Sequence, residues 1–192
     1  MSPSDPLTVL EDSLRGAPII WKGDYPYFIH PISDGIPRMD ADVLRATSDL
    51  IVEMVNWSEI DLIVSVEAMG LPLLAAVGGA TGKPTVVIRK RSYGMDGEVR
   101  VDVSTGYSQS TAYINDIKAG ERLLVVDDVI STGGTLEPLL AALEGMGAIL
   151  QNIIVAIEKG EGCERLARER PNWPISTLAK IDIIDGKVEI VE

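Results

Sequence analysis

The sequence has very little cysteine and histidine. Its 192 residues include one cysteine, Cys163, and one histidine, His30. A single cysteine forms no disulfide within the chain, and neither residue is numerous enough for a zinc cluster. This composition is typical of a protein from a reducing compartment, so we expect a cytoplasmic location and a structural role for Cys163.

Long apolar runs and positive charge are also scarce. No stretch of about 18 or more apolar residues occurs, so no transmembrane helix is expected. Residues 1–5 lack the charged and apolar regions of a signal peptide. There are 17 Lys and Arg residues against 29 Asp and Glu residues, a formal net charge of −12. Such a chain lacks the basic footprint of a nucleic-acid-binding protein, but it can bind an anion where its few cations gather.

Alternating apolar segments predict an α/β fold. Hydrophobic residues make up 46% of the chain, enough for the core of a single domain over residues 1–192. The alternation indicates a mostly parallel, twisted sheet with helices on both faces. The expected core strands are residues 61–66, 84–88, 122–126 and 149–157. The expected helices are residues 5–15, 40–57, 70–81 and 136–146.

Three further segments interrupt this alternation. Residues 21–37 are rich in proline and aromatic residues and are expected to be irregular. Residues 99–103 and 111–115 could form a two-stranded excursion from the sheet. The last twelve residues, IDIIDGKVEIVE, predict a hairpin, since Asp-Gly at 185–186 is a favoured two-residue turn.

The most informative segment is LLVVDDVISTGGTL, residues 123–136. An apolar strand leads into Asp127 and Asp128, and the run STGGT, residues 131–135, then precedes a helix. Small hydroxyl residues and glycines at a helix N-terminus bind phosphate through backbone N–H groups. The two acids would repel a phosphate, so they suit sugar hydroxyls or a hydrated Mg²⁺. The pattern indicates a ribose 5-phosphate site, and the alternative is a polar turn capped by one aspartate.

A dense cationic cluster follows another predicted strand. Arg89, Lys90 and Arg91 lie directly after residues 84–88, where they suit an anionic ligand. Because neighbouring residues on a strand point to opposite sides, we expect Arg89 or Lys90 to face the ligand rather than all three. The alternative is a solvated strand end.

Candidates for binding a flat base lie at two other places. Lys159 follows the strand 149–157 and could donate to an oxo group of such a base or stack on it. The aromatic residues Tyr25, Tyr27 and Phe28 could line an apolar slot. A solvated turn and ordinary packing are the alternatives, and His30 is either a general base or a structural residue of this aromatic segment.

The segment VVDDVISTGGT, residues 125–135, resembles the motif with which type I phosphoribosyltransferases bind 5-phosphoribosyl 1-pyrophosphate (PRPP). VEAMG, residues 66–70, follows a strand as the pyrophosphate loop of that family does, and RKRSYG, residues 89–94, stands where its mobile loop begins. Together with DYPYFIHPISDGIP, TGYS and AIEKGEG, these segments are most similar to the archaeal hypoxanthine phosphoribosyltransferases. The likeness to adenine and xanthine phosphoribosyltransferases is looser.

The resemblance implies the fold of that family, with a small hood from about residues 16–38 and the C-terminal part. It implies a pentosyl-transferring glycosyltransferase of purine salvage, which converts PRPP and hypoxanthine, or guanine, to IMP or GMP and pyrophosphate. Mg²⁺ would arrive with PRPP rather than at a metal site of the protein. A homodimer with no nucleic-acid or membrane partner is expected, and residues 93–107 would form a lid.

The resemblance also assigns roles to individual residues. The implied catalytic residues are Asp127 and Asp128. The implied base-binding residues are Phe28 and Lys159. The implied PRPP-binding residues are Glu67, Ala68, Met69, Gly70, Arg89, Lys90, Ser131, Thr132, Gly133, Gly134 and Thr135.

The sequence departs from its relatives at three places. Bacterial and eukaryotic hypoxanthine-guanine enzymes carry an aspartate where this chain has Ser131. Adenine enzymes often carry a Glu-Tyr pair where this chain has Gly106 and Tyr107, and an arginine where it has Met69. An adenine or xanthine phosphoribosyltransferase stays an alternative. So does a PRPP-sensing transcriptional regulator, although no helix-turn-helix is apparent and the net charge is negative.

Overall fold

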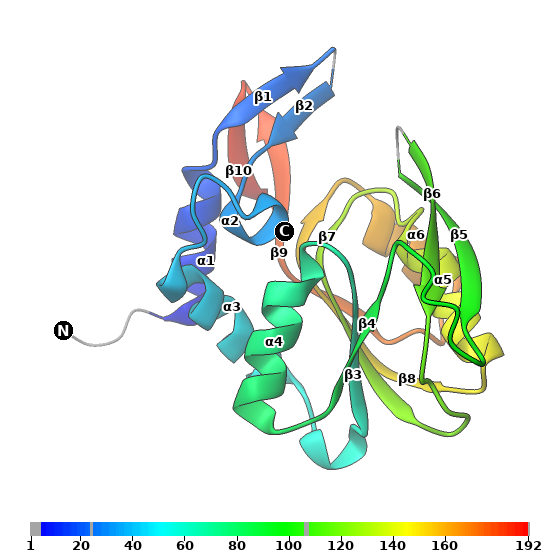
Figure 1. Ribbon diagram of the computed structural model, residues 1–192. Helices are drawn as coiled ribbons and strands as arrows, with labels where there is room; N and C mark the ends of the chain where they lie inside the picture. The colour runs from blue at the N-terminus through cyan, green and yellow to red at the C-terminus, as the bar shows by residue number, and fades with distance from the viewer. Residues whose placement is uncertain (1–4, 24, 106–107, 192) are drawn as a thin grey trace.

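The computed structural model describes residues 5–23, 25–105 and 108–191 (Figure 1). The helices are α1 (Pro6–Arg15), α2 (Pro31–Asp34), α3 (Ala41–Met54), the 3-10 helix η1 (Trp57–Glu59), α4 (Gly70–Thr81), α5 (Leu136–Gly145) and α6 (Gly162–Glu169). The strands are β1 (Ile19–Lys22), β2 (Tyr25–Phe28), β3 (Leu62–Val66), β4 (Thr85–Ile88), β5 (Val99–Thr105), β6 (Ser108–Ile114), β7 (Arg122–Ile130), β8 (Ile149–Lys159), β9 (Ile175–Ile184) and β10 (Lys187–Val191).

The central sheet is mostly parallel. In the described part of the chain, six strands pair in the order β10-β9-β8-β7-β3-β4. All neighbours are parallel except β9 and β10, which form the predicted antiparallel hairpin at one edge. The predicted α/β architecture is confirmed.

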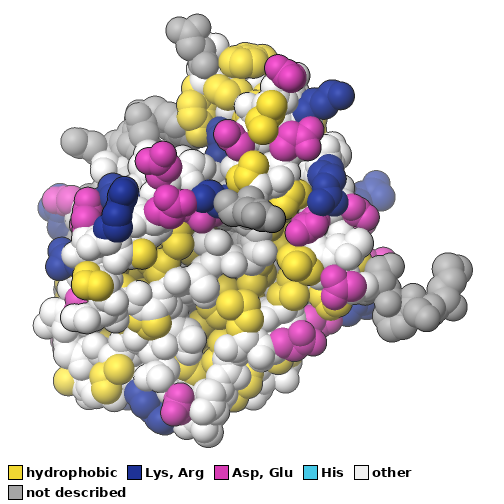
Figure 2. All heavy atoms as spheres, turned by 180° about the vertical axis from the view of Figure 1, so that it is seen from behind, with side chains coloured by type: hydrophobic (Ala, Val, Ile, Leu, Met, Phe, Trp, Pro, Cys, Tyr) yellow, Lys and Arg dark blue, Asp and Glu magenta, His cyan; other side chains and the backbone are white. Residues whose placement is uncertain are grey.

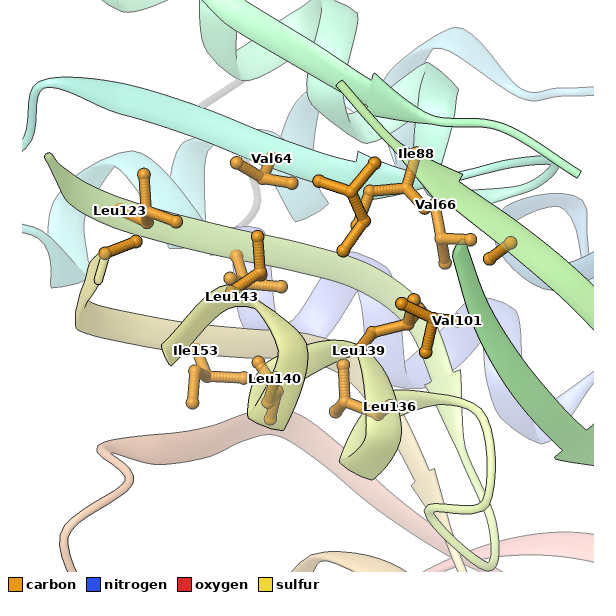
Figure 3. Packing of buried hydrophobic residues seen from close by; sticks show 14 of the residues in the cluster. Val64, Val66, Ile88, Val101, Leu123, Leu136, Leu139, Leu140, Leu143 and Ile153 are labelled. Atoms are coloured by element: carbon orange, nitrogen blue, oxygen red, sulfur yellow. The ribbon is translucent and has the colours of Figure 1, made fainter. Parts of the chain in front are cut away.

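Helices cover both faces of the sheet, because successive strand residues point to opposite sides. On β7, Leu124 and Val126 pack among residues of α1, α3 and α4, whereas Leu123 and Val125 pack among residues of α5 and the β5–β6 hairpin. Figure 3 shows four leucines of α5 against the second face. Burying each such leucine contributes on the order of 1.5–3 kcal/mol.

Several predicted helices have clear local causes. The Asp40 carboxylate accepts hydrogen bonds from the N–H groups of Asp42 and Val43, at 2.8 and 3.2 Å, and so caps α3. Helix α3 ends at Met54, earlier than predicted. The predicted bounds of α4 are confirmed, since Gly82 closes it with φ +69°, a conformation that favours glycine.

The prediction of an irregular segment at residues 21–37 is wrong. It contains most of the β1–β2 hairpin and all of α2. Pro26 is tolerated in β2 because this strand pairs with β1 alone among the described strands. His30 caps α2, since its Nδ1 accepts from the Ile32 N–H at 3.2 Å, and its Nε2 lies 3.0 Å from Ser13 Oγ. These contacts give His30 a structural role.

Strand β5, predicted to end at residue 103, continues to Thr105, and two strands of the central sheet also extend beyond their predicted ends. Strand β7 continues through Asp127 and Asp128, and β8 continues to Lys159, because the two strands stay paired as far as Ile130 and Glu158. Helix α6 is not predicted at all. Its eight residues, GCERLARE, include Leu166 as their only fully buried large apolar side chain.

One face of the molecule carries charged side chains of both signs. On the face shown in Figure 2, Lys and Arg side chains are scattered among Asp and Glu.

None of the described helices is long and apolar enough to span a membrane.

Candidate functional site

A pocket of about 630 Å³ opens at the carboxyl ends of β3, β7 and β8, which is where open parallel sheets bind ligands. The β1–β2 hairpin and the β5–β6 hairpin contribute to it from opposite sides (Figure 1). The predicted site residues that line this pocket are Phe28, Glu67, Ala68, Met69, Lys90, Asp127, Asp128, Ser131, Thr132, Gly133, Gly134, Thr135 and Lys159. Gly70 and Arg89 are not among its described lining residues.

The two acids are neighbours in the pocket, with Asp127 buried and Asp128 half-buried. Asp127 is 7% exposed, and its Oδ1 accepts a hydrogen bond from the Asp128 N–H at 3.0 Å. Burial raises the pKa of Asp127 to about 6. Burial and the adjacent Asp127 carboxylate raise the pKa of Asp128 well above its usual range. A cation or a set of hydroxyl donors placed here would meet one buried and one half-buried acidic side chain.

Gly70 acts behind the acids rather than in the pocket. A Cβ atom at this position would lie 2.0 Å from Ser65 Oγ and 3.1 Å from Asp127 Oδ1. The first distance leaves no space for a side chain, so glycine lets the first turn of α4 approach Ser65 of β3, next to Asp127.

The STGGT loop connects β7 to α5. Gly133 has φ +79°, which favours glycine, and its C=O accepts the Glu137 N–H at 2.9 Å. A Cβ at Gly134 would lie 2.5 Å from the backbone oxygen of Ser104, whose N–H donates to the Gly134 C=O at 3.1 Å. The loop is therefore packed against the root of the β5–β6 hairpin. No described side chain caps α5, so an anion can interact with the N–H groups of its first turn.

The cations after β4 point to different places, as strand alternation predicts. Lys90 lines the pocket, and its charge acts against the rise in the Asp127 pKa. Arg89 instead pairs with Glu67, with 3.2 Å between Nε and Oε2, and lies near the Tyr93 ring. Glu67 also accepts the Lys90 N–H. The carboxylate of Glu67 thus fastens the loop after β3 to the segment after β4.

The base-binding candidates meet at the other end of the pocket. The Lys159 Nζ donates to the Pro26 C=O at 2.6 Å and to the Tyr25 hydroxyl at 2.9 Å. It lies 6.0 Å from the centroid of the Phe28 ring. Hydrogen bonds therefore hold the end of β8 against the β1–β2 hairpin, next to the aromatic rings of Tyr25 and Phe28.

Some residues at the site were not singled out from the sequence. Ser33 of α2 and Ser104, Ser110 and Ala112 of the β5–β6 hairpin line the pocket. Arg165 of α6 donates to the Thr132 C=O at 2.9 Å. The hairpin could have been found from its place in the predicted lid, but nothing in the sequence pattern indicates Arg165. The Gly106-Tyr107 pair, compared above with adenine enzymes, lies outside the described residues.

Comparison with known proteins identifies relatives of this chain. The sequence profile of the phosphoribosyl transferase domain matches residues 35–171. The hypoxanthine/guanine phosphoribosyltransferase of Methanocaldococcus infernus is 46% identical over 181 residues, covering 94% of this chain and 98% of that protein. The protein of the same name from Ferroglobus placidus is 47% identical over 186 residues, covering 97% and 98%.

Solved structures show the same fold at lower identity. The adenine phosphoribosyltransferase of Trypanosoma brucei aligns with a TM-score of 0.75 at 19% identity, covering 94% of this chain and 81% of that one. That of Rhodothermus marinus aligns with a TM-score of 0.73 at 23% identity, covering 91% and 98%. The predicted type I fold is confirmed, and the chain belongs to the phosphoribosyltransferase family.

Proposed function

We propose that this protein is a purine-salvage enzyme that transfers the phosphoribosyl group of PRPP to hypoxanthine, and also to guanine, with release of pyrophosphate. The observation that carries the proposal is that the acid pair and the STGGT loop line one pocket with Lys159 and Phe28. The names of the archaeal relatives at 46% and 47% identity support the choice of base.

The ribose 5-phosphate part of PRPP occupies the centre of the pocket. Its phosphate accepts hydrogen bonds from the N–H groups of the STGGT loop and the first turn of α5. Asp127 and Asp128 accept hydrogen bonds from the ribose hydroxyls. Loss of pyrophosphate from C1 develops positive charge on the sugar, and the carboxylates stabilise it in a water-poor site. Positioning and electrostatics therefore supply the catalysis, with no covalent intermediate on the protein.

The leaving pyrophosphate lies between residues 67–69 and Lys90, the cation that lines the pocket. Mg²⁺, when bound with PRPP, neutralises charge on this leaving group. The pocket suits such an ion, because Mg²⁺ is commonly held by one or two carboxylates together with substrate phosphates, and Asp127 and Asp128 supply carboxylates.

The base binds at the aromatic end, where Lys159 discriminates between purines. Two groups of the β1–β2 hairpin already accept hydrogen bonds from Lys159, and an ammonium has three protons to donate. A 6-oxopurine offers an acceptor to the third proton. The 6-amino group of adenine would place a donor against a donor, which sites of this kind reject strongly.

The surrounding segments have supporting roles in this proposal. The described residues within 16–38 and the C-terminal part form a hood over the base, and the described part of the predicted lid, residues 93–105 of 93–107, excludes water during transfer. We further propose that the enzyme acts as a homodimer in the cytoplasm. The exposed apolar side chains of Ile20, Trp21 and Ile36 are candidates for the dimer contact, and light scattering of the purified protein tests the subunit number.

Pyrophosphate release tests the reaction itself. The purified protein is incubated with PRPP and Mg²⁺, first without a base and then with hypoxanthine. Release that requires hypoxanthine and matches IMP formation mole for mole supports the proposal. No release, or equal release without the base, would contradict it.

A further inference from the structure

Helix α6 contacts the STGGT loop from outside the pocket. Arg165 donates from Nη2 to the Thr132 C=O at 2.9 Å. A Cβ at Gly133 would lie 3.0 Å from Arg165 Nη2 and 3.1 Å from Leu166 Cδ1. Neither Arg165 nor Leu166 is among the described residues that line the pocket, so α6 acts on a ligand without contacting it, through the loop or through its charge.

The first turn of α5 presents a problem for phosphate binding. It carries an acidic residue, Glu137, although this helix terminus faces the proposed phosphate site. A carboxylate there favours the helix itself, because it interacts well with the helix dipole, but it repels a phosphate dianion. An uncompensated Glu137 would therefore weaken binding of the donor.

Arg165 compensates for this carboxylate. Its Nη2 lies 2.9 Å from Glu137 Oε2, and the two side chains are 33% and 28% exposed. Water and salt screen a partly buried pair less than a surface pair. The same guanidinium nitrogen bridges the Glu137 carboxylate and the Thr132 C=O, and the other terminal nitrogen, Nη1, pairs with Glu169 on the same helix. Arg165 therefore offsets the charge of Glu137 and fixes the loop peptide.

We propose that Arg165 is a positioning residue for the 5-phosphate of PRPP. It orients the loop through Thr132 and neutralises Glu137, and both effects let the N–H groups of the loop bind a dianion. The proposal rests on the function proposed above, in which the STGGT loop holds that phosphate. Arg165 acts without touching the substrate.

Calorimetry with two probes separates this role from a general structural one. Ribose 5-phosphate tests the phosphate loop, whereas inorganic pyrophosphate with Mg²⁺ tests the other end of the pocket. Arg165→Met should weaken ribose 5-phosphate binding roughly tenfold, the order expected for one uncompensated charge near a dianion, and should leave pyrophosphate binding unchanged. The matched control is Arg168→Met, because Arg168 lies on the same helix and is exposed.

Two further variants test the electrostatic part. Glu137→Gln added to Arg165→Met should restore most of the lost affinity, because the repelling carboxylate is gone. Glu137→Gln alone should strengthen ribose 5-phosphate binding, since one of the two carboxylates that pair with Arg165 is removed while the ion pair between Arg165 and Glu169 remains. This single variant tests the proposal even if Arg165→Met does not fold.

Three results would overturn the proposal: wild-type affinity in Arg165→Met, no recovery in the double variant, or weaker binding in Glu137→Gln alone. Failure of the proposed function has a different signature. In that case the wild-type protein would bind neither ribose 5-phosphate nor PRPP.

Discussion

The buried, ionised side chain of Asp127 is expected to lower the free energy of unfolding of the protein. Burial raises its pKa from 3.8 to about 6, so the folded state holds the proton more tightly than the unfolded state does. Stability therefore falls as the pH rises from 3.8 through 6, and the full loss is present above that range. Asp127→Asn removes the ionisable group and keeps an oxygen that can accept the Asp128 N–H.

The expected change in the free energy of unfolding follows from the pKa of Asp127 in the unfolded and the folded state. A shift from 3.8 to about 6 corresponds to about 3 kcal/mol at pH 8 and to a few tenths of a kcal/mol near pH 3.5. Burying the amide offsets part of this, so we expect Asp127→Asn to gain about 1–3 kcal/mol at pH 8. At the same time kcat should fall by about 10²–10³-fold, because the charge that stabilises the transition state is lost.

Urea denaturation at both pH values, combined with rate measurements, checks this prediction. Asp61→Asn is the matched control, since the Arg122 guanidinium holds the pKa of Asp61 well below its usual range. That carboxylate stabilises the fold above its usual pKa, so its loss should be destabilising at pH 8. A less stable Asp127→Asn at pH 8, or an equal effect at both pH values, would refute the reasoning.

Three other predictions concern the loop, the base and His30. Gly134→Val should abolish PRPP binding in calorimetry, because its Cβ would lie 2.5 Å from the Ser104 backbone oxygen; Gly79→Ala, with no atom within 4 Å of its Cβ, should bind normally. Lys159→Met should lower kcat/KM for hypoxanthine far more than for adenine in an ultraviolet assay. Burial lowers the pKa of His30 to about 4, so in urea titrations the stability advantage of the wild type over His30→Gln should shrink as the pH falls from 6.5 towards 4.

Elements with one strong local signal could be predicted from the sequence. Helix α4 is an apolar run followed by a glycine, and both of its predicted ends agree with the structure. The motif around Asp127 placed the acids and the STGGT loop together, because the strand, loop and helix are consecutive in the chain. Local sequence carries all of that information.

Features that depend on distant partners could not be predicted. Asp127 and Asp128 belong to β7 because that strand stays paired with β8, which no local pattern reveals. The alternation of side chains along a strand indicated that either Arg89 or Lys90 faces the ligand. Identifying Lys90 as that residue required the contact between Arg89 and Glu67, which only the structure shows. Arg165 was missed because α6 is short and polar, so the helix that carries it gave no signal.

Competition between hypoxanthine and adenine in one reaction measures the proposed base preference of the protein. Equal concentrations of hypoxanthine and adenine are supplied to the wild-type protein with limiting PRPP and Mg²⁺, and the nucleotides formed are separated and counted. We expect IMP to exceed AMP by about 10⁴-fold or more, the discrimination typical of a site that hydrogen-bonds one substrate group and would place its donor against a donor of the other. Comparable amounts of the two nucleotides, or an excess of AMP, would contradict it.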